Sequence, residues 1–330
     1  MVPLRLGCLG AARIAPAALI KPARADPTVE VSAVAARNPS RAQAFAARHG
    51  VAVVHESYEA LLADREIDAV YNPLPNGLHG VWTRRALDAG KHVLCEKPFT
   101  ANAEEAQDVA RAADGAGLVV MEAFHWRYHP LAGRLLEIVA SGELGPLRRV
   151  EATVCFPLLR PRDIRWDLGL AGGALMDAGC YAVHLVRTLA GSEPTVVRAG
   201  ATERRPGVDR ATWAELAFPG GVTGGIRCSM LAVPRVGATV IGEAATLRVV
   251  NPLAPQLWHR ITVKGRSGRR HERVAGGPTY GYQLAAFAAA VREGTPTLTP
   301  PADSIATMQV IDAVYRAAGM EPRQPTAPSS

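Results

Sequence analysis

Short apolar runs alternate with longer amphipathic segments over residues 4–123. The apolar runs have the length and composition of buried strands, and the segments between them have helical spacing. We predict strands at Leu4–Leu9, Val29–Ala35, Val51–Val54, Asp68–Asn72, His92–Cys95 and Leu118–Glu122, and helices at Arg41–Arg48, Tyr58–Ala63, Gly80–Ala89 and Ala103–Gly115. Such repeated units predict an α/β fold with a doubly wound parallel sheet, a Rossmann domain over residues 1–123.

Beyond residue 145 the pattern changes to longer alternating runs separated by turn residues. Strands are expected at Arg149–Phe156, Val196–Thr202, Thr212–Phe218, Gly221–Met230, Thr239–Gly242, Thr246–Val250 and Leu257–Lys264. They predict a large, mainly antiparallel sheet in an α+β domain over residues 124–330. Helices are expected at 280–292 and 303–318, the second returning to the first domain. The proline-rich tail Glu321–Ser330 is expected to be disordered or loosely held.

Composition narrows the class of protein. The chain has 330 residues, 48% of them hydrophobic, which is enough for two domains with substantial cores. It lacks both an apolar run of about 18 uncharged residues and a signal-like start, so we expect no membrane span and a cytoplasmic location. Five scattered cysteines have no metal-ligand spacing, so we expect reduced thiols and no metal.

The net charge of +7 comes mainly from dispersed arginines, with one local cluster at Arg266, Arg269, Arg270 and Arg273. A nucleic-acid site is one explanation for such a cluster. A solvated loop or hairpin is the better one, because no recognised nucleic-acid motif accompanies it. We therefore expect no nucleic-acid partner.

The first predicted strand runs into a turn of small residues, Gly10–Ala15. A dinucleotide fold needs such residues so that the backbone and a helix N-terminus can approach the pyrophosphate. Gly10 supplies the tight turn, whereas Ala12 stands where a second glycine is expected. A generic strand–turn–helix is the alternative. The turn stands at the start of a strand–helix series, which favours cofactor binding. The residues expected to bind the cofactor are Gly10, Ala11, Ala12, Arg13 and Ile14.

The second predicted strand is followed by Arg37 and Arg41, with no acidic residue nearby. An acid at this place would bind the ribose of NAD, whereas arginine accommodates a 2′-phosphate. The alternative is an exposed arginine pair at a helix start. We predict NADP(H) in preference to NAD(H).

Two further strand ends carry candidate cofactor residues. The loop after the fourth strand contains Pro73, Asn76 and His79, and is either a wall for the nicotinamide or simply a stiff turn. The strand at 92–95 ends in Glu96 and Lys97, because Pro98 cannot continue a ladder. Ligands of open α/β sheets bind beyond the carboxyl ends of strands, where Lys97 would lie. A surface lysine in a strand-to-helix loop is the alternative.

A second cluster begins at Gly172 and Gly173 and continues as a mainly apolar helix. Asp177, Tyr181 and His184 fall on one helical face together with Thr188. This polar stripe is either a satisfied structural network or an acid/base site, because polar groups buried without partners cost about 1–3 kcal/mol each. The preceding segment contains Arg165 and Trp166, which suit a polyol, although an exposed loop is the alternative.

Four stretches in this order resemble the Gfo/Idh/MocA oxidoreductase family. They are Gly10–Ala15, Glu96–Pro98, Glu122–Pro130 and Gly172–His184, and together they extend the resemblance over essentially the whole chain. The resemblance is strongest to the branch with dihydrodiol dehydrogenase, NADP-dependent D-xylose dehydrogenase and glucose-fructose oxidoreductase. That branch pairs the motif lysine with a tyrosine.

The resemblance implies roles for individual residues. Lys97 and Tyr181 would be the catalytic pair, with Asp177 and His184 facing the substrate. Trp126 and Arg127, like Glu96, would lie near the cofactor, and the Lys97–Pro98 peptide bond would be cis. The open face of the second sheet would form a homodimer, with a tetramer as the other possibility.

The function expected from these residues is hydride transfer between NADP(H) and a secondary alcohol or ketone, or an aldose and its lactone. The substrate would be a sugar, polyol or cyclic diol. Tyr181 would move the hydroxyl proton, assisted by Lys97, because an ammonium group favours the phenolate. The alternatives are a nucleotide-linked 3-keto sugar reductase and a nucleotide-sensing regulator without catalysis.

Overall fold

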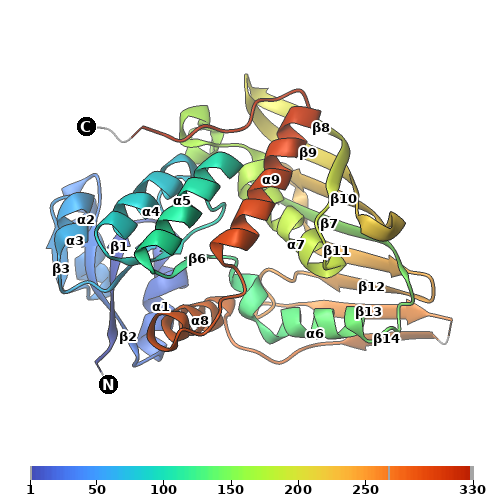
Figure 1. Ribbon diagram of the computed structural model, residues 1–330, viewed down its shortest axis with the longest axis horizontal. Helices are drawn as coiled ribbons and strands as arrows, with labels where there is room; N and C mark the ends of the chain where they lie inside the picture. The colour runs from blue at the N-terminus through green and yellow to red at the C-terminus, as the bar shows by residue number, and fades with distance from the viewer. Residues whose placement is uncertain (1, 267, 328–330) are drawn as a thin grey trace. The chain divides into compact units, whose positions relative to one another are not determined.

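The chain folds into two units in the computed structural model, which describes residues 2–266 and 268–327 (Figure 1). The first unit comprises Met1–His125, Tyr280–Ile305 and Pro325–Ser330, and the second comprises Trp126–Thr279 and Ala306–Gln324. This division differs from the predicted one chiefly at Tyr280–Ile305, which groups with the first unit. The last helix, α9 (Pro301–Ala317), begins in the first unit and continues into the second.

The first unit contains a six-stranded sheet in the order β3-β2-β1-β4-β5-β6. Its strands are β1 (Leu4–Leu9), β2 (Val29–Ala35), β3 (Val53–His55), β4 (Ala69–Asn72), β5 (His92–Cys95) and β6 (Val120–Glu122). All five pairings are parallel. This confirms the predicted doubly wound sheet, whose carboxyl strand ends share one edge.

Helices connect these strands, and three of them begin directly after a residue whose side chain caps the helix. The connecting helices are α1 (Lys21–Ala25), α2 (Pro39–His49), α3 (Tyr58–Ala63), α4 (His79–Asp88) and α5 (Ala103–Ala116). The later helix α8 (Thr279–Glu293) follows β14 and lies almost wholly in the same unit. The side chains of Asn38, Ser57 and Asn102 accept backbone hydrogen bonds at the starts of α2, α3 and α5. The helix after β1 begins with a π-helical turn over Pro16–Ile20.

The second unit contains an eight-stranded sheet in the order β14-β13-β12-β11-β7-β10-β9-β8. Its strands are β7 (Leu147–Pro157), β8 (Thr195–Arg205), β9 (Val208–Ala217), β10 (Thr223–Ser229), β11 (Leu231–Gly242), β12 (Ala245–Val250), β13 (Arg260–Gly265) and β14 (Gly268–Glu272). Only the β7–β10 pair is parallel among these described strands. The prediction of a large, mainly antiparallel sheet is confirmed.

Two features of this sheet were missed from the sequence. The strand β14 has no apolar alternation, because it is an edge strand whose side chains are mostly exposed. The strands β13 and β14 pair antiparallel as a hairpin. A solvated loop or hairpin was the interpretation favoured from the sequence for the arginine cluster in this stretch. The strand β11 begins earlier than predicted, and its register against β7 shifts between Leu231 and Arg235, around Pro234.

The helix α7 (Cys180–Ala190) packs on β7, β10 and β11. The stretch Leu168–Ala190 is, among the described residues, long and apolar enough to cross a membrane by length and composition. Its most apolar window is 83% buried within the protein, as expected for a core helix. A further helix of this unit, α6 (Pro130–Ala140), was not predicted.

The tail does not match the sequence prediction of a loosely held segment. Arg323 is 2% exposed and donates through Nε to the carbonyl oxygen of Gly172 at 2.8 Å. Pro322 is also buried, while the last three residues, 328–330, lie outside the described part of the chain. The prediction was therefore wrong for the start of the tail, because polar composition did not reveal a specific ion-pair partner.

Candidate functional site

The turn after β1 has the backbone shape that a dinucleotide needs. Gly10 has φ +110°, where a side chain would be strained, and its N–H donates to the carbonyl oxygen of Ala35 at 2.7 Å. A Cβ atom at Gly10 would lie 3.3 Å from the Leu74 side chain. Ala11, Ala12 and Ile14 are half-buried and Arg13 is exposed. The turn keeps open the approach that a pyrophosphate requires, and the residues present fit a dinucleotide.

The arginines after β2 lie beside this turn. Arg37 is exposed, and its backbone N–H donates to the Tyr58 hydroxyl at 3.2 Å. The Arg41 Nη2 donates to the carbonyl oxygen of Ala11 at 3.2 Å. Burial raises the pKa of Tyr58 above its ordinary value, so this hydroxyl stays protonated near neutral pH. Tyr58, which the sequence analysis did not single out, thus holds the backbone of a predicted cofactor residue.

The loop after β4 is held by side chains of the same strand end. The Asn72 Nδ2 donates to the carbonyl oxygen of His79 at 3.0 Å and to the Thr83 hydroxyl at 3.2 Å. Pro73 and Asn76 are half-buried, as residues lining a cofactor would be. The buried amide of Asn72 therefore fixes the loop from within the sheet.

His79 has a different place from the one expected. Its side chain is 1% exposed, with Nδ1 2.7 Å from the carbonyl oxygen of Pro98 and Nε2 2.7 Å from that of Leu74. Burial lowers the pKa of His79 to about 4. Because both ring nitrogens face backbone oxygens, we correct its role from direct cofactor contact to positioning of the neighbouring loops.

The turn after β5 presents Lys97. The Lys97–Pro98 peptide bond is cis, as the resemblance implied. Glu96 is buried, and its Oε1 accepts a hydrogen bond from the Tyr71 hydroxyl at 2.7 Å. Burial and this carboxylate hold the pKa of Tyr71 well above its ordinary value. The carboxylate of Glu96 thus takes part in a buried hydrogen bond of the fold. Lys97, by contrast, is half-buried at the edge of the sheet.

Two aromatic residues of the same unit were not predicted. The rings of His125 and Tyr280 lie 4.3 Å apart, and burial raises the Tyr280 pKa above its ordinary value. Burial, with a smaller contribution from the Lys97 charge, lowers the pKa of His125 to about 3. His125 is therefore neutral beside the lysine. Tyr280 gives no sequence signal, because it is far from the other site residues in the chain.

The helix with the second cluster starts differently from the prediction. Leu175–Gly179 forms a π-helical turn, and the α-helix α7 begins at Cys180. Such turns are frequent at functional sites. Among residues 171–187 Tyr181 alone is not buried; it is half-buried. The residues around Tyr181 on this stretch are thus buried, while Tyr181 itself is partly exposed to solvent.

Asp177 is held by an ion pair. Its Oδ2 lies 2.9 Å from Nε of Arg165, and Nη1 of the same arginine lies 3.5 Å from Oδ1 of Asp163. Asp163 is buried, while the Arg165 side chain is 39% exposed. The structure therefore joins two predicted substrate residues, Asp177 and Arg165, into one charged group with Asp163.

His184 is 1% exposed and paired with a tryptophan. The Trp126 Nε1 donates to the His184 Nδ1 at 3.2 Å, and the two rings meet edge to face at 5.4 Å. A neutral His184 then carries its proton on Nε2, because Nδ1 acts as the acceptor. Trp126 belongs to a 3₁₀ turn over His125–Tyr128, together with the half-buried Arg127.

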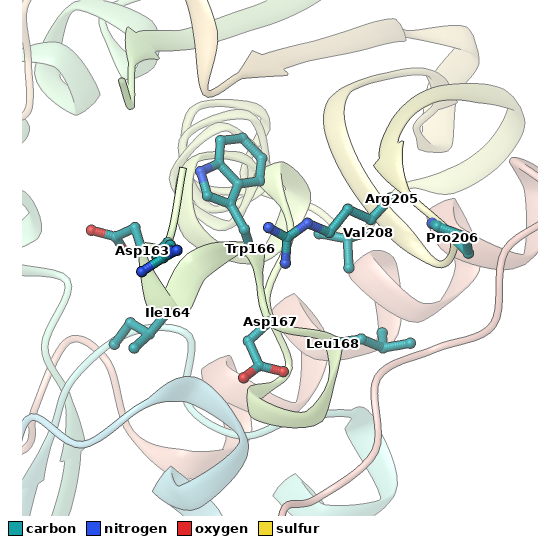
Figure 2. A pocket seen from close by; sticks show the side chains of 9 residues that line it. Asp163, Ile164, Trp166, Asp167, Leu168, Arg205, Pro206 and Val208 are labelled. Carbon is teal, nitrogen blue, oxygen red and sulfur yellow. The ribbon is translucent and has the colours of Figure 1, made fainter. Parts of the chain in front are cut away.

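A cavity of about 380 Å³ opens beside the segment that precedes the helix (Figure 2). It is lined by Arg162, Asp163, Ile164, Trp166, Asp167, Leu168, Arg205, Pro206 and Val208. Trp166 is 1% exposed, and the Arg204 guanidinium lies 4.5 Å from its ring centroid. Figure 2 shows Trp166 between Asp163 and Arg205. Trp166 is thus a packed wall of this cavity.

Residues 2–266 and 268–327 contain no group of three His, Cys, Asp or Glu side chains arranged to hold a metal ion. The five cysteines are free thiols, and four of them are buried.

Family models cover both units. Residues 4–124 match an oxidoreductase family with an NAD-binding Rossmann fold, and residues 133–248 match the GFO/IDH/MocA C-terminal domain. These matches fit the turn at Gly10 in the first unit and the large sheet of the second.

Similar proteins act on sugars. The chain is 37% identical over 319 residues to D-xylose 1-dehydrogenase (NADP(+)) 2 of Haloferax volcanii, covering 96% of this chain and 97% of that protein. It is 37% identical over 297 residues to dTDP-3,4-didehydro-2,6-dideoxy-alpha-D-glucose 3-reductase of Streptomyces violaceoruber, covering 88% and 85%.

A solved structure extends the likeness to the fold. KijD10, a 3-ketoreductase from Actinomadura kijaniata in complex with NADP and TDP-benzene, superposes with a TM-score of 0.91 at 30% identity, covering 96% of this chain and 98% of that one. The parallel sheet of the first unit and the large, mainly antiparallel sheet of the second agree with these matches. The chain therefore belongs to the Gfo/Idh/MocA family of oxidoreductases and is an NAD(P)-dependent enzyme.

Proposed function

We propose that this protein interconverts a secondary alcohol and a ketone, or an aldose and its lactone, on a sugar, polyol or cyclic diol with NADP(H). The observation that carries the proposal is that Tyr181 is only half-buried on an otherwise buried helix segment. A phenol in that position can exchange a proton with a substrate hydroxyl. The similar sugar dehydrogenase and keto sugar reductase support the substrate class.

The cofactor, when bound, accepts or supplies the hydride. Tyr181 takes the hydroxyl proton in the oxidation and returns it in the reduction. Lys97 assists, because an ammonium group stabilises a phenolate and can also donate a hydrogen bond to the reacting oxygen. His125 and His79 are neutral near pH 7, because burial lowers the pKa of each. The positive charge in this part of the proposed site therefore comes from Lys97, after β5.

The remaining polar groups of the helix bind the substrate. The Nε2–H of His184 is a donor, and Asp177 is an acceptor oriented by Arg165. A donor and an acceptor one helical turn from Tyr181 on each side suit adjacent hydroxyls of a sugar. In this proposal Trp166, which lines the cavity of Figure 2, contributes an apolar wall for the substrate.

Arginine at the end of β2 supports NADP(H) over NAD(H). Arg37 is exposed and has a guanidinium that can pair with a 2′-phosphate, while its backbone is fixed by Tyr58. The NADP named for both the similar xylose dehydrogenase and KijD10 points the same way.

A nucleotide-linked 3-keto sugar is the second candidate substrate. The cavity of Figure 2 contains Arg162 and Arg205, and Asp163 on its wall already pairs with Arg165. Guanidinium groups of this kind bind phosphate through a planar fork. The similar dTDP-sugar reductase favours this candidate, and a regulator that senses the cofactor without catalysis is the remaining alternative.

The test is a spectrophotometric assay of NADP⁺ reduction with D-xylose and other aldoses, and of NADPH oxidation with a dTDP-linked 3-keto sugar. Tyr181→Phe and Lys97→Met should each lower kcat by about 100-fold or more, while fluorescence titration shows unchanged NADPH binding in Tyr181→Phe. Turnover of Tyr181→Phe within a few-fold of the parent contradicts the mechanism. Tight NADPH binding without turnover of any substrate favours the regulator.

The proposal includes a cytoplasmic homodimer, or a tetramer, that uses the open face of the eight-stranded sheet. Trp213 of β9 is 38% exposed and alternates with the buried Thr212 and Ala214, so it lies on the face opposite theirs. Light scattering after gel filtration measures the mass. A monomer at micromolar concentration would contradict the assembly but not the chemistry.

A further inference from the structure

We propose that Arg323 and Asp209 form a clamp that positions the substrate-binding helix, so that the C-terminal segment is part of the machinery that aligns Asp177 and Tyr181. The inference rests on the proposed function of Tyr181 for its catalytic consequence. Its structural part stands on contacts within the second unit, none of which involves the cofactor.

The centre of the clamp is the carboxylate of Asp209, on β9, which is 0% exposed. Its Oδ1 accepts from Arg323 Nη2 at 2.9 Å and from the Tyr315 hydroxyl at 3.0 Å. Its Oδ2 accepts from the backbone N–H of Leu175 and from the Thr212 hydroxyl, both at 2.7 Å. A buried charge with partners on both oxygens has a fixed orientation.

One of these partners is the helix itself. Leu175 is the first residue of the π-helical turn, so its N–H is a group that the helix leaves without an intrahelical acceptor. A carboxylate at a helix N-terminus also meets the positive end of the helix dipole. Asp209 therefore fixes where the helix begins, two residues before Asp177.

Arg323 fixes the chain immediately before that start. Its Nε donates to the carbonyl oxygen of Gly172 at 2.8 Å while Nη2 holds Asp209. The guanidinium also lies 4.1 Å from the ring centroid of Tyr315, as in a cation–π pair. The guanidinium of Arg323 thus joins the C-terminal tail to α9, to β9 and to the glycine pair, Gly172 and Gly173.

The glycine pair makes this arrangement possible. Gly173 has φ +135°, and a Cβ atom there would collide with the Asp209 Oδ1. The carbonyl oxygen of Gly173 then accepts from the N–H of Asp177 at 3.1 Å. The contacts therefore run from Arg323 through Gly172 and Gly173 to Asp177, without Arg323 touching the substrate. We class Arg323 and Asp209 as positioning residues.

A matched control lies near the other end of the helix. Arg187 is 6% exposed, donates through Nη1 to the Thr307 hydroxyl at 2.6 Å, and pairs with Glu193. It is a buried arginine on the same helix, and these two partners belong to α9 and to the loop after α7. Arg187→Ala should therefore cost stability without moving Asp177 or Tyr181.

The first readout needs no substrate. Hydrogen–deuterium exchange, followed by mass spectrometry, is measured on peptides covering residues 172–181 in the full-length parent, Arg323→Ala, Asp209→Asn and Arg187→Ala. We expect faster exchange over these residues in Arg323→Ala and Asp209→Asn and parent-like exchange in Arg187→Ala. Unchanged exchange in Arg323→Ala, or an equal increase in all three variants, overturns the clamp.

The second readout links the clamp to the reaction. Arg323→Ala should lower kcat at least about 10-fold, because a misplacement of about 1 Å in a reacting group can cost about 100-fold in rate. The kinetic isotope effect with 4-deuterated NADPH should rise, and millimolar guanidinium should restore part of the rate. Arg187→Ala should keep the parent isotope effect. Loss of folded protein without a change in isotope effect or rescue indicates a purely structural role and contradicts the inference.

The two proposals fail in different ways. If the parent enzyme turns over no sugar, polyol or keto sugar, the proposed function fails, whereas the exchange experiment still decides whether the clamp exists. If the parent is active and Arg323→Ala has parent-like kinetics, the inference fails while the proposed function stands.

Discussion

The Nδ1 of His79 lies 2.7 Å from the carbonyl oxygen of Pro98, so one imidazole connects the loop after β4 to the lysine turn after β5. The second ring nitrogen faces the carbonyl oxygen of Leu74 at the same distance. A neutral ring has a single N–H and can donate to one of these oxygens only. The buried ring therefore determines how the two cofactor-side loops are held together.

Replacing His79 should loosen this connection. His79→Gln should lower the free energy of unfolding by about 1–3 kcal/mol, because a buried hydrogen bond and its packing are lost. The NADPH dissociation constant should rise with it, since the Lys97 turn is no longer fixed. Urea denaturation and fluorescence titration measure the two effects. His49→Gln, at the end of α2, is the control and should change neither.

The histidines of the first unit should make the protein sensitive to acid. Burial lowers the pKa of His79 to about 4, below its unfolded value of 6.5. A depressed folded pKa gives stability that is present above pH 6.5 and is lost as the pH falls toward 4. The parent should thus lose about 2–3 kcal/mol more than His79→Gln over this range. Urea denaturation at each pH measures the free energy of unfolding. An equal loss of this free energy in the parent and in His79→Gln would show that His79 makes no such contribution.

Trp126 should act on the substrate through His184. Trp126→Phe keeps an aromatic ring but removes the N–H that His184 Nδ1 accepts, so the imidazole tautomer is no longer fixed. We expect the KM for the sugar to rise about 5- to 10-fold, with NADPH binding unchanged. Steady-state kinetics and cofactor titration separate these parameters. A weaker NADPH affinity instead would support direct contact of Trp126 with the cofactor.

The arginines beside the dinucleotide turn should select the cofactor. Arg37→Ala should weaken NADPH binding about 10-fold or more and leave NADH binding unchanged, because a phosphate-paired guanidinium is removed. Arg41→Ala should weaken both cofactors, since Arg41 also holds the Ala11 carbonyl oxygen. Arg48→Ala, exposed on the same helix, is the control. Equal loss for NADPH and NADH in Arg37→Ala would reject the 2′-phosphate assignment.

Glu105 should make the first unit less stable at alkaline pH. Its Oε2 accepts from the N–H of Ala101 at 2.8 Å, and burial raises its pKa from 4.5 to about 7. A raised folded pKa gives stability that is full below pH 4.5 and is lost as the pH rises through 7. Glu105→Gln should stabilise the protein by about 1–3 kcal/mol at pH 8 and by little at pH 4.5. An equal effect at both values of pH would contradict the raised pKa.

The order of the elements could be predicted from the sequence. Strands such as β1, β2 and β5 were predicted at their observed bounds, because buried parallel strands are short, mainly apolar runs followed by turn or capping residues. The polar strand β14 was missed, because an edge strand carries no such signal. The same local reasoning selected Gly10, Arg37 and Lys97 as candidates, since each lies within two residues of the end of a strand.

The sequence by itself determined the fold class, the family and the residue types available for hydride-transfer chemistry, because these depend on periodicity and on motifs of a few adjacent residues. Only the tertiary structure decided which polar groups form hydrogen bonds or ion pairs within the protein. It buried both nitrogens of His79 against carbonyl oxygens, paired Asp177 with Arg165, and brought Arg323 to Asp209 across 114 residues. Such contacts depend on three-dimensional packing between distant segments, which no local pattern encodes.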